Sequence, residues 1–188
     1  MVTVVAKLKL TLTSEQQEKV RALALSYRDA LNFVSKTSFA NKKTSNKKKL
    51  HNLTYYEIRD KFGLPSQMAC TAVREVSAKY KGLWTKAKKN AEHRKLGLTK
   101  KRFKGLDNAP HFSSRTYTLT YARDYALQTD TQTVALMAQG GRIKAGFTGY
   151  AKHIAWLKKG KLGEAKVWYD RSKKTYYLLV SVTLPTAD

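Results

Sequence analysis

Cysteine is almost absent from this sequence of 188 residues, in which Cys70 is the only one. A single thiol cannot form a disulfide within the chain, and it cannot build a zinc site that depends on several cysteine ligands. A chain without structural disulfides fits a reducing compartment. We therefore expect a cytosolic setting.

Long apolar runs are missing as well. No segment stays apolar over the length that crossing a bilayer requires, and the start of the chain lacks the charged-then-apolar pattern of a secretory signal. We therefore expect no membrane partner. Apolar residues still make up 42% of the sequence and aromatic residues 11%, which is enough to pack a core and excludes a disordered basic tail.

Acidic residues are scarce: 13 Asp and Glu stand against 37 Lys and Arg, which gives a formal net charge of +24. Self-repulsion at this charge opposes compaction, so an ordinary soluble enzyme has little reason to carry it. A polyanionic partner supplies the reason, because neutralising its phosphates releases condensed counterions. The composition predicts a nucleic-acid-binding protein.

Patterns of catalytic residues are also lacking. Metal-assisted phosphodiester hydrolysis needs several carboxylates at one site, whereas Asp107, Asp124, Asp130 and Asp170 are scattered and fit turns between elements. The histidines do not form pairs at metal-ligand spacing, and no glycine-rich phosphate loop of the GxxxxGK type occurs. We therefore predict no catalytic residue, no metal and no cofactor. An independent nuclease or transposase is the least favoured hypothesis.

The first forty residues predict a strand followed by a long helix. Residues 2–12 alternate between apolar and polar side chains, as a half-buried strand does. Apolar residues then recur at helical spacing over about 15–40, with Thr13 or Ser14 as the N-cap. Residues 41–49 predict a polar basic loop, which either is a solvated linker or contacts phosphate.

Two further helices are predicted before the chain changes character. Thr54 and Glu57 have the spacing of a capping box for a short helix that ends at Gly63. Pro65 cannot continue that helix, and Ser66 is the predicted cap of a third one.

After Pro110 the pattern becomes that of strands, at 115–121, 133–138, 142–147, 164–170 and 175–184. The first strand has no partner nearby in sequence, so we expect it to pair with the late strands. The predicted fold is α+β: a small antiparallel β-barrel from residues 1–12 and 110–186, with a helical bundle and basic linker inserted at 13–109.

Positive charge is densest between residues 79 and 104, where Glu92 is the only acid. This density exceeds what a solvated surface needs, although solubility alone is the alternative explanation. We predict that these cations, together with one on the following strand, bind RNA or phosphate: Lys79, Lys81, Lys86, Lys88, Lys89, Arg94, Lys95, Lys100, Lys101, Arg102, Lys104 and Arg115.

Five segments in this order resemble the N-terminal half of TnpB, the transposon-encoded, RNA-guided nuclease of bacterial insertion sequences and a relative of type V CRISPR effectors. They are LPSQMACTAVREVSAKYKGLW (64–84), KKRFKG (100–105), HFSSRTYTL (111–119), GGRIK (140–144) and WYDRSKKTYYLLVSVTL (168–184). Each is weak alone, but the five occur in the order of the family and extend from residue 64 to residue 184.

The resemblance implies an architecture and partners. In that family the early and late strands form a WED barrel, and the inserted helices form the REC lobe. Together they hold a structured guide RNA and read a short motif beside the double-stranded target DNA, comparable to PAM reading. The family implies a cytoplasmic protein of bacteria or archaea.

The resemblance also implies which residues read the DNA motif. By position in the family's segments these are Tyr55, Ser66, Gln67, Cys70, Ser113, Ser114 and Thr116. Gln67 suits a bidentate contact to adenine, whereas Cys70 departs from the polar residue expected there. The alternatives are a helix cap for Ser66 and simple packing for Tyr55.

A RuvC nuclease domain follows this region in the family, opening with an aspartate in a GxDxG-like stretch. Asp188, in LPTAD, lacks that glycine context, and we do not expect it to be catalytic. Cleavage would then need a RuvC polypeptide in trans, or the sequence is a truncated protein. The alternative function is a stand-alone DNA-binding regulator of helix-turn-helix type, with helices from Tyr55 to Lys89 joined by FGLPS.

Overall fold

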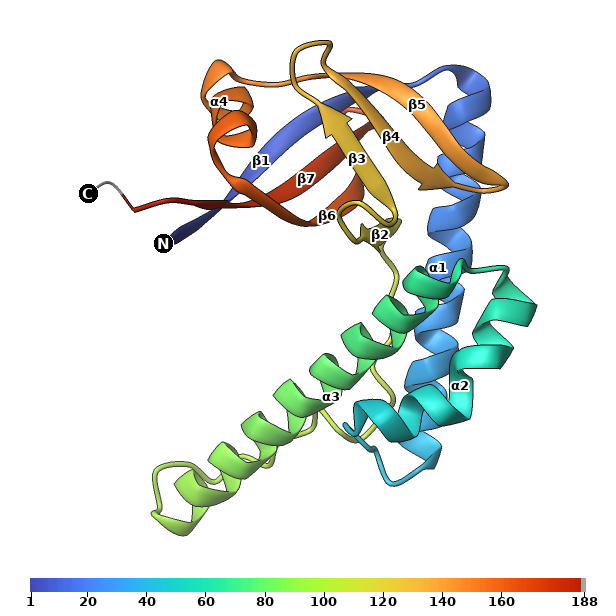
Figure 1. Cartoon of the computed structure of the whole chain (residues 1–188). Coiled ribbons are helices and arrows are strands. Elements are labelled where there is room, and N and C mark those ends of the chain that lie inside the picture. Colours follow the sequence, from blue (N-terminus) through green and yellow to red (C-terminus); the bar gives the residue numbers. More distant parts are fainter. Residues whose placement is uncertain (187–188) are drawn as a thin grey trace. The chain divides into compact units, whose positions relative to one another are not determined.

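The computed structural model describes residues 1–186 (Figure 1). Residues 1–27 and 114–186 cluster into one compact unit, the barrel unit, and residues 28–113 form a second, the helical unit. The domain bounds expected from the sequence remain a prediction. The strands are β1 (Val2–Thr11), β2 (Thr116–Leu119), β3 (Tyr125–Gln128), β4 (Thr133–Ala138), β5 (Gly141–Thr148), β6 (Lys161–Asp170) and β7 (Thr175–Leu184). The helices are α1 (Ser14–Ala40), α2 (Lys47–Phe62), α3 (Ser66–Lys95) and α4 (Ala151–Lys159).

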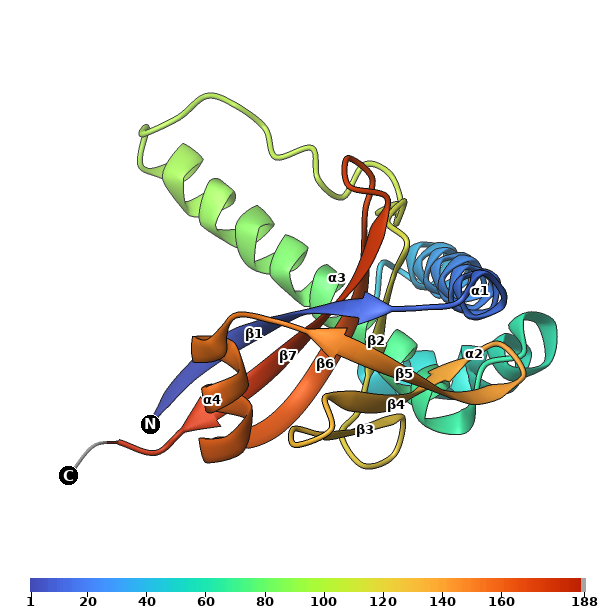
Figure 2. The same cartoon turned by 90° about the horizontal axis from the view of Figure 1, so that it is seen from above.

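The barrel unit is a seven-stranded antiparallel sheet in the order β2-β6-β7-β1-β5-β4-β3, curled into a near-closed barrel (Figure 2). The first strand pairs with the last: Val2 lies opposite Leu184 and Lys9 opposite Tyr177. The end of β1 also pairs with β5. These pairings confirm that the first strand joins the late strands, and the α+β fold with a helical insertion after β1 is confirmed.

Strand alternation determines which side chains fill the barrel. Ala6, Leu8 and Leu10 of β1 are buried, whereas the intervening Lys7 and Lys9 point to the outer face. Two tyrosines complete the core, and each satisfies its hydroxyl by donating to a backbone carbonyl: Tyr117 to Met137 at 2.9 Å and Tyr125 to Gly163 at 2.6 Å. The core therefore buries these polar groups with hydrogen-bond partners.

A capping box begins α1. The Thr13 hydroxyl accepts a hydrogen bond from the backbone N–H of Gln16 at 3.2 Å, and the Gln16 side chain accepts from the Thr13 N–H at 3.1 Å. Of the two caps that the sequence allows, Thr13 is therefore the one used.

The predicted starts of the next two helices are wrong. The basic loop ends earlier than residue 49, because Asn46 caps α2 by accepting from the N–H of Lys49. Thr54 is no cap: it lies buried inside α2, and its hydroxyl donates to the Leu50 carbonyl at 2.6 Å. Ser66 is the first residue of α3, and Pro65 occupies the N-cap position without a side-chain cap hydrogen bond. The predicted end of α2 is confirmed, with Gly63 in the left-handed region at φ 64°.

A buried polar cluster joins three segments of the helical unit. The Tyr80 hydroxyl of α3 donates to the Ser35 carbonyl of α1 at 2.7 Å. The Ser35 hydroxyl donates to the carbonyl of Pro110 at 2.6 Å. Tyr80 is fully buried, and its hydrogen bond fixes α3 against α1. The hydrogen bond of the Ser35 hydroxyl fixes α1 against the chain that returns from the tip of α3.

Two elements were not predicted from the sequence. The strand β3 has four residues without alternation, and α4 is a nine-residue helix with only Leu157 buried. Tertiary contacts stabilise both elements: β3 pairs with β4, and α4 lies against β1 (Figure 2). Within residues 1–186, no helix combines the length and apolar character that crossing a membrane requires.

Candidate nucleic-acid interface

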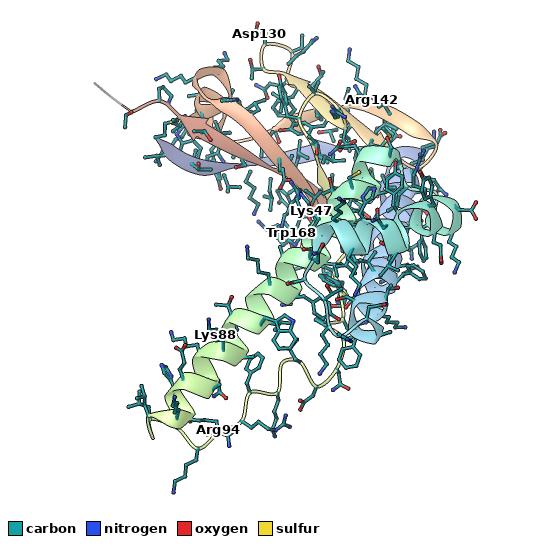
Figure 3. All side chains as sticks on the ribbon, turned by 60° about the horizontal axis from the view of Figure 1, so that its bottom comes forward. Lys47, Lys88, Arg94, Asp130, Arg142 and Trp168 are labelled. Carbon is teal, nitrogen blue, oxygen red and sulfur yellow. The ribbon has the colours of Figure 1, made fainter. Side chains whose placement is uncertain are left out.

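A groove forms where α2 and α3 pack against each other in the helical unit. It encloses about 400 Å³. We call it the α2–α3 groove, and its lining residues are Lys47, Lys48, His51, Gln67, Cys70, Thr71, Val73 and Arg74. The lining includes three cationic side chains and no carboxylate, so its potential favours an anionic ligand. Figure 3 labels Lys47 at the start of α2.

Two residues predicted to read a DNA motif lie in this groove. Gln67 and Cys70, in the first turns of α3, both line it. The Gln67 carbonyl accepts the hydroxyl of Thr71 at 2.9 Å within the helix. A glutamine amide offers a donor and an acceptor together, which is the pattern that pairs with an adenine edge. The groove thus combines cations with a side chain suited to reading a base.

A third predicted reader, Tyr55, joins the groove through His51. The two rings are one helical turn apart on α2 and stack at 4.5 Å between centroids, with 19° between their planes. The Arg59 guanidinium continues this stack at 5.7 Å from the Tyr55 ring centroid. The three side chains therefore form one stack along a face of α2, with the Tyr55 ring between His51 and Arg59.

The remaining predicted readers do not line the α2–α3 groove. Ser66 is exposed at the start of α3. Ser113 ends the helical unit, and Ser114 begins the barrel unit. The hydroxyls of Ser114 and Thr116 lie 2.6 Å apart, and Thr116 pairs with Trp168 at the edge of the sheet. Five of the seven predicted readers therefore belong to the helical unit, and Ser114 and Thr116 belong to the barrel unit.

Residues 79–104 form a projecting basic arm, made of the second half of α3 and the chain that returns along it. Eleven Lys and Arg against one Glu give this segment a formal charge of +10. All eleven cations are exposed, and Figure 3 shows Lys88 and Arg94 toward the tip of the arm. An exposed surface with this charge density suits the phosphates of a nucleic acid.

Asn90 holds the returning chain against α3. Its amide donates to the Lys101 carbonyl at 3.0 Å and accepts the backbone N–H of Phe103 at 3.0 Å. The Phe103 ring then folds over Gly105, where any β-carbon would lie 2.4 Å from the ring. The cations of the return segment are thereby carried on an ordered backbone.

Arg102 differs from the other predicted phosphate ligands of the arm. Its guanidinium donates to both carboxylate oxygens of Asp107, each at 2.8 Å. Hydrogen bonds from Arg102 hold the pKa of Asp107 below its ordinary value, and they raise the pKa of Arg102. Among the described residues, the other ten cations of the arm make no ion pair. Arg102 is thus the arm cation whose charge is already matched within the chain.

Arg115, the predicted phosphate ligand outside the arm, packs within the barrel unit. Its guanidinium carbon lies 5.2 Å from the ring centroid of Tyr169, and the residue is half-buried. The face of the ring attracts the cation electrostatically.

Two of the aspartates, Asp170 and Asp124, accept hydrogen bonds within turns. Asp170 accepts the N–H of Ser172 at 3.0 Å and its hydroxyl at 2.7 Å, and these hydrogen bonds lower its pKa. Asp124 is buried and accepts the Thr120 N–H at 2.9 Å, while burial raises its pKa. Within residues 1–186, no three His, Cys, Asp or Glu side chains gather as a metal site would require. Asp188 lies outside the described residues.

Sequence reasoning missed six of the eight residues that line the groove: Lys47, Lys48, His51, Thr71, Val73 and Arg74. The two lysines were part of the predicted basic loop at 41–49, which left phosphate contact open. His51 carries one signal that sequence alone offers, because it lies four residues before Tyr55 and shares its helical face. Arg74 enters the groove from α3 and has no such signal.

Comparison with known proteins assigns the chain to no family. No model of a protein family matches it, and no curated protein matches it.

Proposed function

We propose that this chain is the nucleic-acid-recognition module of a TnpB-like RNA-guided DNA endonuclease. In this role it holds a structured guide RNA and reads a short motif beside the target DNA. The observation that carries the proposal is the α2–α3 groove: Gln67 and Cys70, which the resemblance to TnpB marks as motif readers, line one cationic groove, and Tyr55 stacks on its wall. The strand–helices–strands order of WED and REC adds support.

The proposal divides the work between surfaces. The basic arm binds phosphates without regard to sequence, because it offers charge and no fixed base contact. The α2–α3 groove reads sequence, with Gln67 toward an adenine and Lys47, Lys48 and Arg74 toward the flanking phosphates. Strand cleavage belongs to a RuvC nuclease, supplied in trans or as a neighbouring domain. The setting is the cytoplasm of a bacterium or archaeon.

A motif-selection experiment tests the role of the groove. The complex of protein and guide RNA is presented with target DNA whose adjacent positions are randomised, and the bound molecules are sequenced. We expect one short motif to be enriched, with an adenine preference that Gln67→Ala relaxes at one position. Losing a bidentate base contact lowers discrimination at that position by about 1–3 kcal/mol.

The matched control is Gln128→Ala, which removes the same side chain from an exposed position on β3. An unchanged motif with Gln67→Ala, or equal relaxation by both variants, would contradict the assignment of base reading to the groove.

One observation favours a second candidate, a DNA-binding regulator that needs no RNA. The helices α2 and α3 are joined by a three-residue turn, Gly63 to Pro65, with Gly63 at φ 64°, and a short turn with glycine is typical of a helix-turn-helix. The start of its second helix would then read bases in the major groove. This candidate predicts that the protein alone selects a duplex sequence, whereas the TnpB-like function requires guide RNA for selection.

A further inference from the structure

A second cavity lies on the outer face of the barrel unit, and none of its residues was predicted as a contact. It encloses about 310 Å³. We call it the lysine–tyrosine pocket, and its lining residues are Lys7, Lys9, Thr148, Gly149, Tyr150, Lys173 and Tyr177. Three ammonium groups without a carboxylate favour an anion here.

Aromatic rings support the lysines of this pocket. The Lys7 ammonium lies 4.4 Å from the ring centroid of Tyr177 and 5.4 Å from that of Trp168. Lys9, Tyr177 and Trp168 are register partners across β1, β7 and β6. Tyr177 is only 8% exposed, so it holds Lys7 in place rather than offering a face to a ligand.

Tyr150 supplies the exposed ring. It is 76% exposed and directly precedes α4. Its ring meets His153 edge to face, with centroids 5.6 Å apart. His153 in turn stacks on Trp156 at 4.8 Å, and its Nδ1 accepts the backbone N–H of Lys7 at 3.1 Å. The tyrosine is therefore linked to the strand that carries Lys7 and Lys9.

The chain also passes very close to β1 at this point. A β-carbon on Gly149 would lie 3.1 Å from a methyl group of Leu8 and 3.2 Å from the Lys7 carbonyl. The absence of a side chain at Gly149 lets Tyr150 approach the lysines. The aromatic ring and the cations are thus positioned before any ligand arrives.

We propose that the lysine–tyrosine pocket binds one unpaired nucleotide of a single-stranded nucleic acid. The base stacks on Tyr150, and Lys9 and Lys173 hold the adjoining phosphates, with Lys7 fixed beneath them. The volume lies at the small end of the range for ligand pockets, which suits a single nucleotide. Within a duplex each base already has neighbours on both faces, so only an unpaired base offers a free face to Tyr150.

Binding of labelled oligouridine of about 12 nucleotides tests this inference, with an RNA duplex of the same length as the comparison. We expect Tyr150→Ala to weaken oligouridine binding by about fivefold or more, because one stacked base is lost. Tyr150→Phe should retain binding, since the ring remains. Neither variant should change the salt slope, because neither removes a charge. Duplex binding should be unaffected.

Replacing lysines of the pocket, in contrast, should change the salt dependence of binding. Lys9→Ala with Lys173→Ala should lower the slope of log affinity against log salt by about 1.4, at about 0.7 per contact to a single strand. The matched control is Lys144→Ala with Lys159→Ala, which removes the same charge from exposed positions of the barrel unit outside the pocket. This control variant should retain most of the salt slope of the parent protein.

The aromatic control is Tyr121→Ala, which removes an exposed tyrosine of the same unit that does not line the pocket. Equal loss from Tyr121→Ala and Tyr150→Ala, or equal weakening of oligouridine and duplex by Tyr150→Ala, would overturn the inference. Oligothymidine distinguishes the source of the strand: a loss confined to oligouridine assigns the pocket to RNA, and an equal loss assigns it to single strands of either kind.

Thermal unfolding of each variant verifies that Tyr150, which is mostly exposed, can be replaced without loss of the fold. The inference does not rest on the proposed function, because the probes contain no guide and no motif. Oligouridine binding that depends on Tyr150, in a protein that selects no guide RNA, would refute the proposed function alone.

Discussion

Neighbouring cations on the basic arm should differ sharply in their contribution to nucleic-acid binding. Lys100, Lys101 and Lys104 make no ion pair among the described residues, whereas Arg102 is held by both carboxylate oxygens of Asp107 at 2.8 Å. A lysine that meets a phosphate releases a condensed counterion. Arg102 has its carboxylate partner already and would have to lose it first. We expect the three lysines to contribute to the salt dependence and Arg102 to contribute little.

The expected magnitude follows from counterion release. Replacing the three lysines with alanine removes up to three contacts at about 0.9 each, which lowers the slope by about 2.7. Salt rising from about 50 to about 200 mM is a change of about 0.6 in the logarithm. Over that range the parent protein should therefore lose about 40 times more affinity than the triple variant.

The assay is fluorescence anisotropy with a structured, base-paired RNA at several salt concentrations. The control is Arg102→Ala with Asp107→Ala, which removes the ion pair and leaves the net charge unchanged. Its slope should match that of the parent. A triple variant with an unchanged slope would remove these lysines from the interface. A control whose slope falls by about 0.9, the value of one phosphate contact, would refute the distinction drawn from the Asp107 ion pair.

Three further predictions concern stability. Tyr80→Phe should lower the free energy of unfolding by about 1 kcal/mol, because the Ser35 carbonyl loses its buried donor; urea titration measures this, and Tyr56→Phe, at a 79% exposed site, should have no effect. Thr13→Ala should cost about 1 kcal/mol through the lost cap of α1, and a loss that also occurs with Thr13→Ser would argue against a cap. Because the folded pKa of Asp107 is depressed, its ion pair contributes stability above the ordinary aspartate pKa of 3.8 and loses it as the pH falls through the lower folded value. Asp107→Asn should lack that acid-dependent component in urea titrations at successive pH values, and identical pH profiles would contradict it.

The fold was largely predictable because its long elements carry clear periods. Alternation places Ala6, Leu8 and Leu10 of β1 in the core, and Tyr176, Leu178, Val180 and Val182 of β7. The first strand has no partner nearby in sequence, so it pairs with the last one. The starts of α2 and α3 were not predictable from cap residues alone. Asn46, Thr54 and Ser66 all have cap chemistry, yet only Asn46 is a cap. Thr54 is buried inside α2, and the N-cap position of α3 belongs to Pro65.

The candidate site was predictable only in part, because its residues meet across elements. Gln67 and Cys70 came from the resemblance to TnpB, and the density of lysines identified the arm. Packing of α2 on α3 brings Lys47 and Arg74 to the same groove, and no spacing in the sequence encodes that contact. The Arg102–Asp107 pair likewise depends on the bend of the returning chain.

The measurement that tests the central claim most directly is the identity of the nucleic acid that the protein selects in cells. The chain is expressed in bacteria with its native flanking non-coding DNA, purified at moderate salt, and its bound nucleic acid is treated with RNase or DNase. We predict one discrete, RNase-sensitive species encoded by the flank. Protein that carries no discrete RNA, yet selects a particular duplex by itself, would contradict the account and favour the helix-turn-helix regulator.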